Sequence, residues 1–178
     1  MRNVVLLAGL LMSQASFANE PLGFKEFEIG GDLAAYAQSA GMRCMPPKEG
    51  VTTCATSTPN GSASTIAGVQ VERIYFMGLQ GRLGDITVRF SSARFAEVLD
   101  AYRARFARIK CKESVVQNRM GAKFDQTECE HESAAGLVRL TKRGSNLDTA
   151  EVSLTSTELI KFFSRGAEED RQKAKKDI

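Results

Sequence analysis

The sequence predicts an α+β protein built from two tandem units, each a helix followed by an antiparallel sheet, which share a sheet and end in a C-terminal helix. A strand-to-helix junction occurs twice, because residues 88–95 match residues 152–159 at an offset of 64. The 4 cysteines also fall two in each half of the chain. We therefore expect one unit at residues 19–91 and a second unit, with the C-terminal helix, at residues 92–178.

The first 18 residues have the three-part pattern of a secretory signal peptide. Arg2 precedes a mostly apolar run at residues 4–12, and Ser16 and Ala18 lie at the −3 and −1 positions of the expected cleavage point. The run is too short for a membrane-spanning helix, which needs about 20 apolar residues. We expect a periplasmic or secreted protein with no integral membrane segment after cleavage.

In the first unit, residues 32–41 predict a short helix. Leu33, Tyr36, Ala37 and Ala40 share one helical face, and a glycine follows as a natural stop. Strands come next. We expect a hairpin within residues 51–67 around an Asn-Gly pair, because both residue types tolerate positive φ, and a second hairpin whose turn spans residues 78–84.

The second unit begins with the clearest amphipathic helix of the chain, capped by Ser91 or Ser92. One face of it carries apolar side chains at steps of three and four, namely Phe95, Val98, Leu99, Tyr102 and Phe106. Three strands are expected at residues 124–132, 137–141 and 150–154. Thr155 and Glu158 then have capping-box spacing and predict the start of the third helix.

The cysteines predict two disulfides, because an even number in an exported chain favours disulfides over metal or nucleophile roles. Four cysteines allow three pairings. The tandem repeat selects the pairing that keeps each bond inside its own unit, Cys44 with Cys54 and Cys111 with Cys129. Each bond should contribute about 2–4 kcal/mol of stability.

A helix, a cysteine after it, a second cysteine in the first strand and an antiparallel sheet, all repeated behind a signal peptide, resemble the β-lactamase inhibitory protein fold. In that family the two sheets join edge to edge into one concave surface that clamps a partner protein. The resemblance implies a binding module without chemistry of its own. The chain departs from the pattern in having no Trp and only 3 Tyr, of which Tyr36 and Tyr102 lie on expected core faces.

The familiar catalytic and metal-binding patterns are weak in this sequence. His131 is the only histidine, and alternation along a strand separates it and Cys129 from Glu130 and Glu132, so we expect an exposed strand residue instead of a zinc ligand. No Gly-x-Ser-x-Gly elbow presents a serine. We expect no enzyme activity, no metal and no cofactor.

Three weaker features have ordinary explanations. Paired carboxylates of a glycan hydrolase could come from among Glu49, Asp85, Asp125 and Glu128, although each is typical of a surface acid. The glycines at 78, 81 and 84 precede a strand, whereas a phosphate loop opens a helix. The basic second helix and its exit favour a solvated face or an acidic or lipid contact, and they contain Arg94, Arg103, Arg105, Arg108, Lys110 and Lys112.

These observations favour a binding module that recognises a protein or a cell-envelope component through its sheet face, and that could be inhibitory. A net charge of +3 gives no electrostatic reason to expect nucleic acid. The alternatives are an envelope assembly or structural accessory protein, and a carboxylate-based glycan hydrolase. The candidate contacts lie at a hairpin tip that presents mixed apolar and charged side chains, Met77, Leu79, Gln80 and Arg82.

Overall fold

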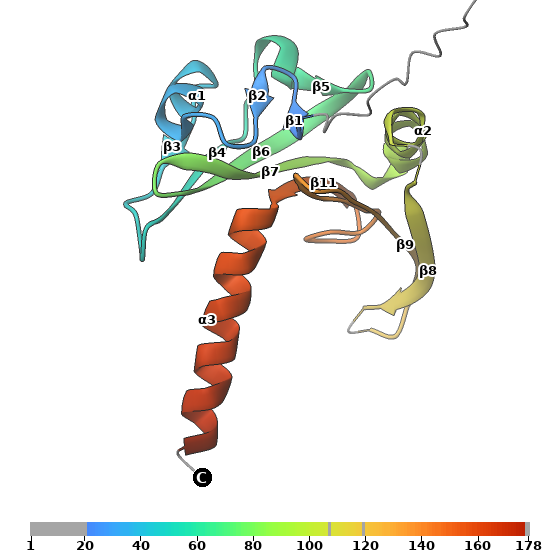
Figure 1. The fold of residues 1–178 in the computed structure, drawn as a ribbon. Coiled ribbons are helices and arrows are strands. Elements are labelled where there is room, and N and C mark those ends of the chain that lie inside the picture. The colour runs from blue at the N-terminus through green and yellow to red at the C-terminus, as the bar shows by residue number, and fades with distance from the viewer. Residues whose placement is uncertain (1–20, 107, 119, 177–178) are drawn as a thin grey trace, which may run out of the picture.

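The computed structural model describes residues 21–106, 108–118 and 120–176, and the expected signal peptide lies outside these residues. One large antiparallel sheet organises them, with the strand order β3-β4-β6-β7-β11-β10-β9-β8 and the short β5 paired to β6 (Figure 1). The α+β class and the C-terminal helix predicted from the sequence are confirmed. Within the described residues, no helix is long and apolar enough to cross a membrane.

Both halves of the sheet are wound from the border inward. In the first half the chain runs from a helix to the border strand and then to the centre, through α1 (Leu33–Ser39), β3 (Arg43–Cys44), β4 (Val51–Thr56), β6 (Val69–Leu79) and β7 (Arg82–Ser91). The second half does the same through α2 (Phe95–Arg105), β8 (Lys110–Gln117), β9 (Lys123–Glu132), β10 (Gly136–Thr141) and β11 (Thr149–Ser156). The halves meet where β7 pairs with β11.

At this seam, one pair of residues that match in the sequence lie opposite each other. Val88 pairs with Val152, and these are the first residues of the two matching segments. A two-fold rotation through the seam therefore relates the aligned positions of β7 and β11. The division of the chain into two units at residue 91 stays a prediction. The matching segments on which it was based begin in the two strands that form the seam.

One face of the sheet is covered and forms the core. Figure 1 shows α1, α2 and the small ribbon of β1 (Gly23–Phe24) and β2 (Phe27–Glu28) on the same side of the sheet. Phe27 of this ribbon packs edge-on against Phe76 of β6, with ring centroids 4.9 Å apart. The five apolar residues that predict the amphipathic face of α2 are all buried. Alternation along each strand leaves the other face of the sheet open to solvent.

Both disulfides expected from the repeat are present, and each joins directly opposed residues of a border strand and its inner neighbour. Cys44 of β3 bonds to Cys54 of β4, and Cys111 of β8 bonds to Cys129 of β9. The inner sulfur-bearing residue of each pair is fully buried. The two bonds thus fasten the outermost strands of the sheet on either side.

The expected hairpin around Asn60 and Gly61 is wrong. Asn60 has an extended backbone with φ −123°, and a single turn of 3-10 helix, η1 (Gly61–Ser64), follows it. A two-residue hairpin of the Asn-Gly type needs positive φ at both positions. The strand β4 instead pairs with β3 and β6, while β5 (Thr65–Ile66) pairs with β6. The conformation of residues 51–67 is therefore determined by pairing with β3 and β6 and not by the local turn preference of Asn60 and Gly61.

The second hairpin is present, but its turn is shorter than residues 78–84. Gln80 and Gly81, with φ of +52° and +80°, form the two-residue turn. Gly78 and Gly84 belong to β6 and β7, where they give room to other side chains: a Cβ on Gly78 would lie 2.6 Å from Leu33 Cδ2. The glycines serve close packing against the helices rather than turn formation.

The helix starts also differ from the sequence prediction. A 3-10 turn, η2 (Ser92–Arg94), precedes α2, and neither serine caps that helix with its side chain. The third helix, α3 (Thr157–Lys176), is capped by Ser156, whose Oγ accepts a hydrogen bond of 3.0 Å from the Leu159 amide. The hydroxyl of Thr155, the expected cap, donates to Asp85 instead. Sequence spacing identifies the junction but not the residue that caps it.

The helix α3 leaves the sheet on the open side (Figure 1). Its first turn packs on the sheet, because Leu159 is buried against Gly84 of β7. Farther along, Phe163 is 49% exposed, and the remaining described side chains to Lys175 are exposed. The helix is therefore anchored at its root and projects away from the body of the protein.

Candidate functional site

The open face of the sheet is the candidate site. Strand register places one row of side chains across the eight strands on this face, one from each: Arg43, Ala55, Tyr75, Thr87, Ser153, Arg139, Glu130 and Lys110. The row begins with a basic residue, continues through an alanine, a tyrosine and two hydroxyl residues, and ends with an acid between two bases. It contains Tyr75, the tyrosine that is not on a core face.

Tyr75 lies between two arginines, and we call Arg73, Tyr75 and Arg89 the arginine–tyrosine cluster. Arg73 Nη1 donates to the Tyr75 hydroxyl oxygen at 3.2 Å, and Arg89 Nη1 donates to the same oxygen at 2.7 Å. The Arg89 guanidinium carbon is also 4.5 Å from the centroid of the Tyr75 ring. Because Arg73 and Arg89 are directly opposed on β6 and β7, the cluster concentrates positive charge.

Glu151 of β11 partly neutralises the cluster. Its carboxylate oxygen lies 2.6 Å from Arg89 Nε, and it also accepts a hydrogen bond from the Ser145 amide at 3.2 Å. Both ion-pair side chains are about one quarter exposed, at 27% and 22%. The pair therefore crosses the seam between the two halves and ties the loop before β11 to the open face.

Asp85 is a carboxyl group on β7 at the same seam. Its two oxygens accept hydrogen bonds from the hydroxyls of Thr155, at 2.6 Å, and Thr87, at 2.9 Å. Burial raises the pKa of Asp85, and the two hydroxyl donors oppose this effect. Because both oxygens already have partners, the group holds the strands together at the point where α3 begins.

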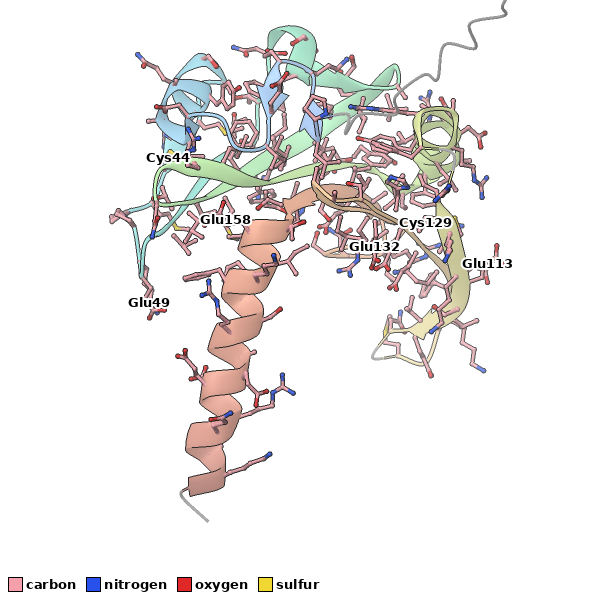
Figure 2. The ribbon with its side chains drawn as sticks, in the orientation of Figure 1. Cys44, Glu49, Glu113, Cys129, Glu132 and Glu158 are labelled. Carbon is pink, nitrogen blue, oxygen red and sulfur yellow. A yellow bond between two sulfur atoms is a disulfide. The ribbon has the colours of Figure 1, made fainter. Side chains whose placement is uncertain are left out.

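The far half of the open face carries an acidic strip formed by Glu128, Glu130 and Glu132 of β9. The strip lines a hollow of about 580 Å³ together with Lys110 and Lys112 of β8. Arg139 Nε donates to Glu130 at 2.7 Å. Figure 2 shows Glu132 on the side of the sheet from which α3 projects. The open face is thus basic over β6 and β7, whereas the acids of β9 are interleaved with Lys110, Lys112 and Arg139 on the neighbouring strands.

The hairpin-tip residues proposed from the sequence do not form a free tip. Met77 lies half-buried on β6, and the turn is held by neighbouring backbone, because Gln80 N donates to Gly50 O and Leu33 N donates to Gly81 O. Leu79 and Arg82 line a cavity of about 320 Å³ that also contains the first turn of α3. These four residues belong to the rim of the open face rather than to an isolated loop.

His131 is half-buried and not the exposed residue that we expected. Its ring lies on Phe106 with centroids 4.9 Å apart, and its buried Nδ1 makes no hydrogen bond within the described residues. Cys129, on the same face of β9, is committed to a disulfide. No group of three or more His, Cys, Asp or Glu in the described part of the chain could hold a metal ion.

The acids considered for hydrolysis are dispersed. Glu49 lies at the tip of the β3–β4 hairpin, far from β9 and its strip (Figure 2). Asp125 is exposed on the outer part of β9, and Asp85 is engaged with two hydroxyls. The geometry gives no support to a pair built on Glu49, and it gives Asp85 a structural role.

Two of the cations at the second helix have acidic partners on its own surface. Arg94 bonds to Glu97, and Arg103 lies 3.5 Å from Asp100. Arg105 donates to the Gly23 carbonyl and stacks on Phe106. These pairs fit the interpretation of a solvated helix face.

The sequence analysis missed the arginine–tyrosine cluster. Arg73 and Tyr75 are two residues apart on one strand, but Arg89 joins them only through the pairing of β6 with β7. The available signal was that Tyr75 is the tyrosine left without an expected core position. In comparisons with protein-family models, with curated proteins and with solved structures, the chain matches none of them.

Proposed function

We propose that this protein is an exported, disulfide-stabilised binding module that recognises another protein through the open face of its sheet. The observation that carries the proposal is the asymmetry of the sheet. One face is covered by helices and forms the core, whereas the other presents charged side chains and a tyrosine flanked by arginines. Tyrosine and arginine are, with tryptophan, the side chains enriched at energetically important positions of protein interfaces.

Export is supported by the disulfides, since such bonds persist in oxidising compartments. The resemblance to the β-lactamase inhibitory protein family, in which a shared concave sheet clamps a partner, agrees with the same use of the sheet. Whether binding inhibits the partner, or serves envelope assembly, depends on what that partner is. Both outcomes use the same surface.

Site-specific photocrosslinking tests the proposal. Benzoylphenylalanine is introduced in place of Thr53 or Ser153, which lie on the open face in different halves of the sheet. The control position is Glu28, an exposed residue of the ribbon on the covered side. We expect both open-face positions to give the same light-dependent adduct in the exporting cell, and Glu28 to give none.

An adduct that forms equally well from Glu28, or the absence of any adduct from the open face at native expression, would contradict the proposal. Mass spectrometry of the adduct identifies the partner as an enzyme or an envelope component. An enzyme whose activity falls on addition of the purified chain would assign an inhibitory role.

A further inference from the structure

We propose that the arginine–tyrosine cluster is the point at which the open face receives carboxylate side chains from an acidic segment of its protein partner. This inference rests on the proposed function and names the chemistry of the partner. It concerns Arg73, Tyr75 and Arg89 on the open face of β6 and β7.

The cluster offers hydrogen-bond donors to whatever lies above it. A tyrosine hydroxyl accepts through its lone pairs and donates one proton. In Tyr75 the oxygen already accepts from both Arg73 and Arg89, so its own proton is left to donate outward. Arginine carries donors and no acceptor. The surface is therefore matched to an oxyanion with more than one oxygen, such as a carboxylate.

The charge on the cluster is not balanced within the described chain. Arg89 has Glu151 as its ion-pair partner, whereas Arg73 bonds to Tyr75 and has no ion-pair partner among the described residues. Like charges directly opposed on neighbouring strands destabilise a sheet. Arg43 adds a further cation two strands away in the row of Tyr75. An acidic group placed over Arg73 and Arg89 would relieve this repulsion.

The other half of the face favours a protein over a polyanion such as a lipid surface or a nucleic acid. The acidic strip on β9 is three strands from β7, a distance of about 14 Å at the usual strand spacing. A uniformly negative surface that approached the cluster would meet a half of mixed charge, in which Glu128, Glu130 and Glu132 alternate with cations of β8 and β10. A protein can present an acidic segment to one half and a basic segment to the other.

A titration with a defined peptide tests the inference. The probe is an acetylated, amidated peptide of alternating glycine and glutamate, added to ¹⁵N-labelled protein of residues 19–178 at low salt. A peptide with glutamine in place of glutamate is the control. We expect amide shifts centred on residues 73–75 and 87–89 with the glutamate peptide, and no saturable shifts with the glutamine peptide.

Two variants assign the donors. Arg73→Gln removes an exposed cation and should weaken binding of the peptide about threefold to fivefold, the range expected for exposed charge pairs. Tyr75→Phe keeps the ring and removes the phenolic hydroxyl to which both arginines bond, and we expect a loss of about twofold. Lys25→Gln, which removes one charge from the turn of the covered ribbon, should leave the affinity unchanged.

The inference is overturned if Arg73→Gln binds the glutamate peptide as tightly as Lys25→Gln does. It is also overturned if vesicles of anionic phospholipid bind more tightly than the peptide in a manner that depends on Arg73, or if Arg73→Gln dissociates a dimer of the chain. If the glutamate peptide does not bind at the cluster but position 153 still crosslinks to a partner, this inference is refuted and the proposed function stands. Loss of every open-face crosslink would refute the proposed function itself.

Discussion

Asp85 has a larger influence than its position in the middle of a strand suggests, because it joins the two halves of the sheet. Thr87 and Thr155, which donate to it, come from β7 and β11. Burial raises the pKa of Asp85 above the ordinary value of 3.8. The native state therefore holds a proton at pH values at which the unfolded chain has released it.

Stability should consequently fall as the pH rises through the interval between these two pKa values, since the unfolded chain binds fewer protons there than the native state. We predict that Asp85→Asn, which stays uncharged and can still bond to both hydroxyls, lacks this loss. Urea unfolding of both proteins from about pH 3 to about pH 7 measures the difference. The free energy of unfolding of the wild type should fall relative to that of the variant as the pH rises above the ordinary carboxyl pKa.

At pH values below that interval the carboxyl is protonated in both states, and the difference between the two proteins should become constant. Other titrating groups are common to both proteins and cancel in the comparison. A variant whose stability relative to the wild type is the same at every pH would show that the charge of Asp85 does not matter to folding.

Single residues also mark the limit of prediction from this sequence. Asn60 and Gly61 favour a turn, yet their strands take other partners, because hairpin pairing depends on what lies alongside. The cluster on the open face was missed since it forms across two strands. Its members become neighbours only when the register of β6 and β7 is known.

At the scale of elements, α3 is attached by one turn. Leu159 is 1% exposed and lies against Gly84, whereas the helix beyond Phe163 has exposed side chains in its described part. Helices of this length owe most of their stability to tertiary packing. The root and the shaft of α3 should therefore contribute very differently to the stability of the protein.

We predict that Leu159→Ala lowers the free energy of unfolding by about 2–4 kcal/mol, the cost typical of removing a buried leucine side chain. Ending the chain after Arg165 should change that free energy by less than about 0.5 kcal/mol, as for surface changes in general. Chemical denaturation of the two variants measures both effects. A truncated protein that is as unstable as the Leu159→Ala variant would show that the part of α3 beyond Arg165 packs against the rest of the protein in solution.

Elements with a strong periodic pattern were predicted well, and those without one were not. The apolar face of α2 is continuous, and the strands β9, β10 and β11 lie within a few residues of their expected limits. The border strand β8 was missed because nearly all of its side chains are exposed, so no alternation remains in its sequence. The short strands β1 and β2 carry too few residues to show a period.

For the whole molecule, the β7–β11 seam predicts that the two halves unfold together. Val88 and Val152 are opposed there and both are fully buried. We predict that Val152→Ala costs about 2 kcal/mol and lowers the hydrogen-exchange protection of Ile74 in the first half as much as that of Leu140 in the second. Exchange at those two amides, followed by nuclear magnetic resonance, measures this. Independent changes in the two halves would mean that each is stable without its neighbour.

The α+β class, the C-terminal helix and the two disulfides could be predicted from the sequence, because periodic patterns and the placement of the cysteines indicate them. The residues that come together on the open face could not be predicted, because they alternate with core residues and show no pattern of their own. The side chains that could bind a partner there become neighbours only through the pairing of the strands.

The two disulfides join the outermost strands to their inner neighbours, and this makes the edges of the sheet sensitive to redox conditions. The unpaired backbone groups of an edge strand can pair with other molecules. Here each border is closed into a short covalent ring, from Cys44 to Cys54 and from Cys111 to Cys129, and each ring is worth about 3 kcal/mol. Under reducing conditions both rings open, and the outer strands lose this covalent constraint. Oxidising conditions close the rings and stabilise both edges of the sheet.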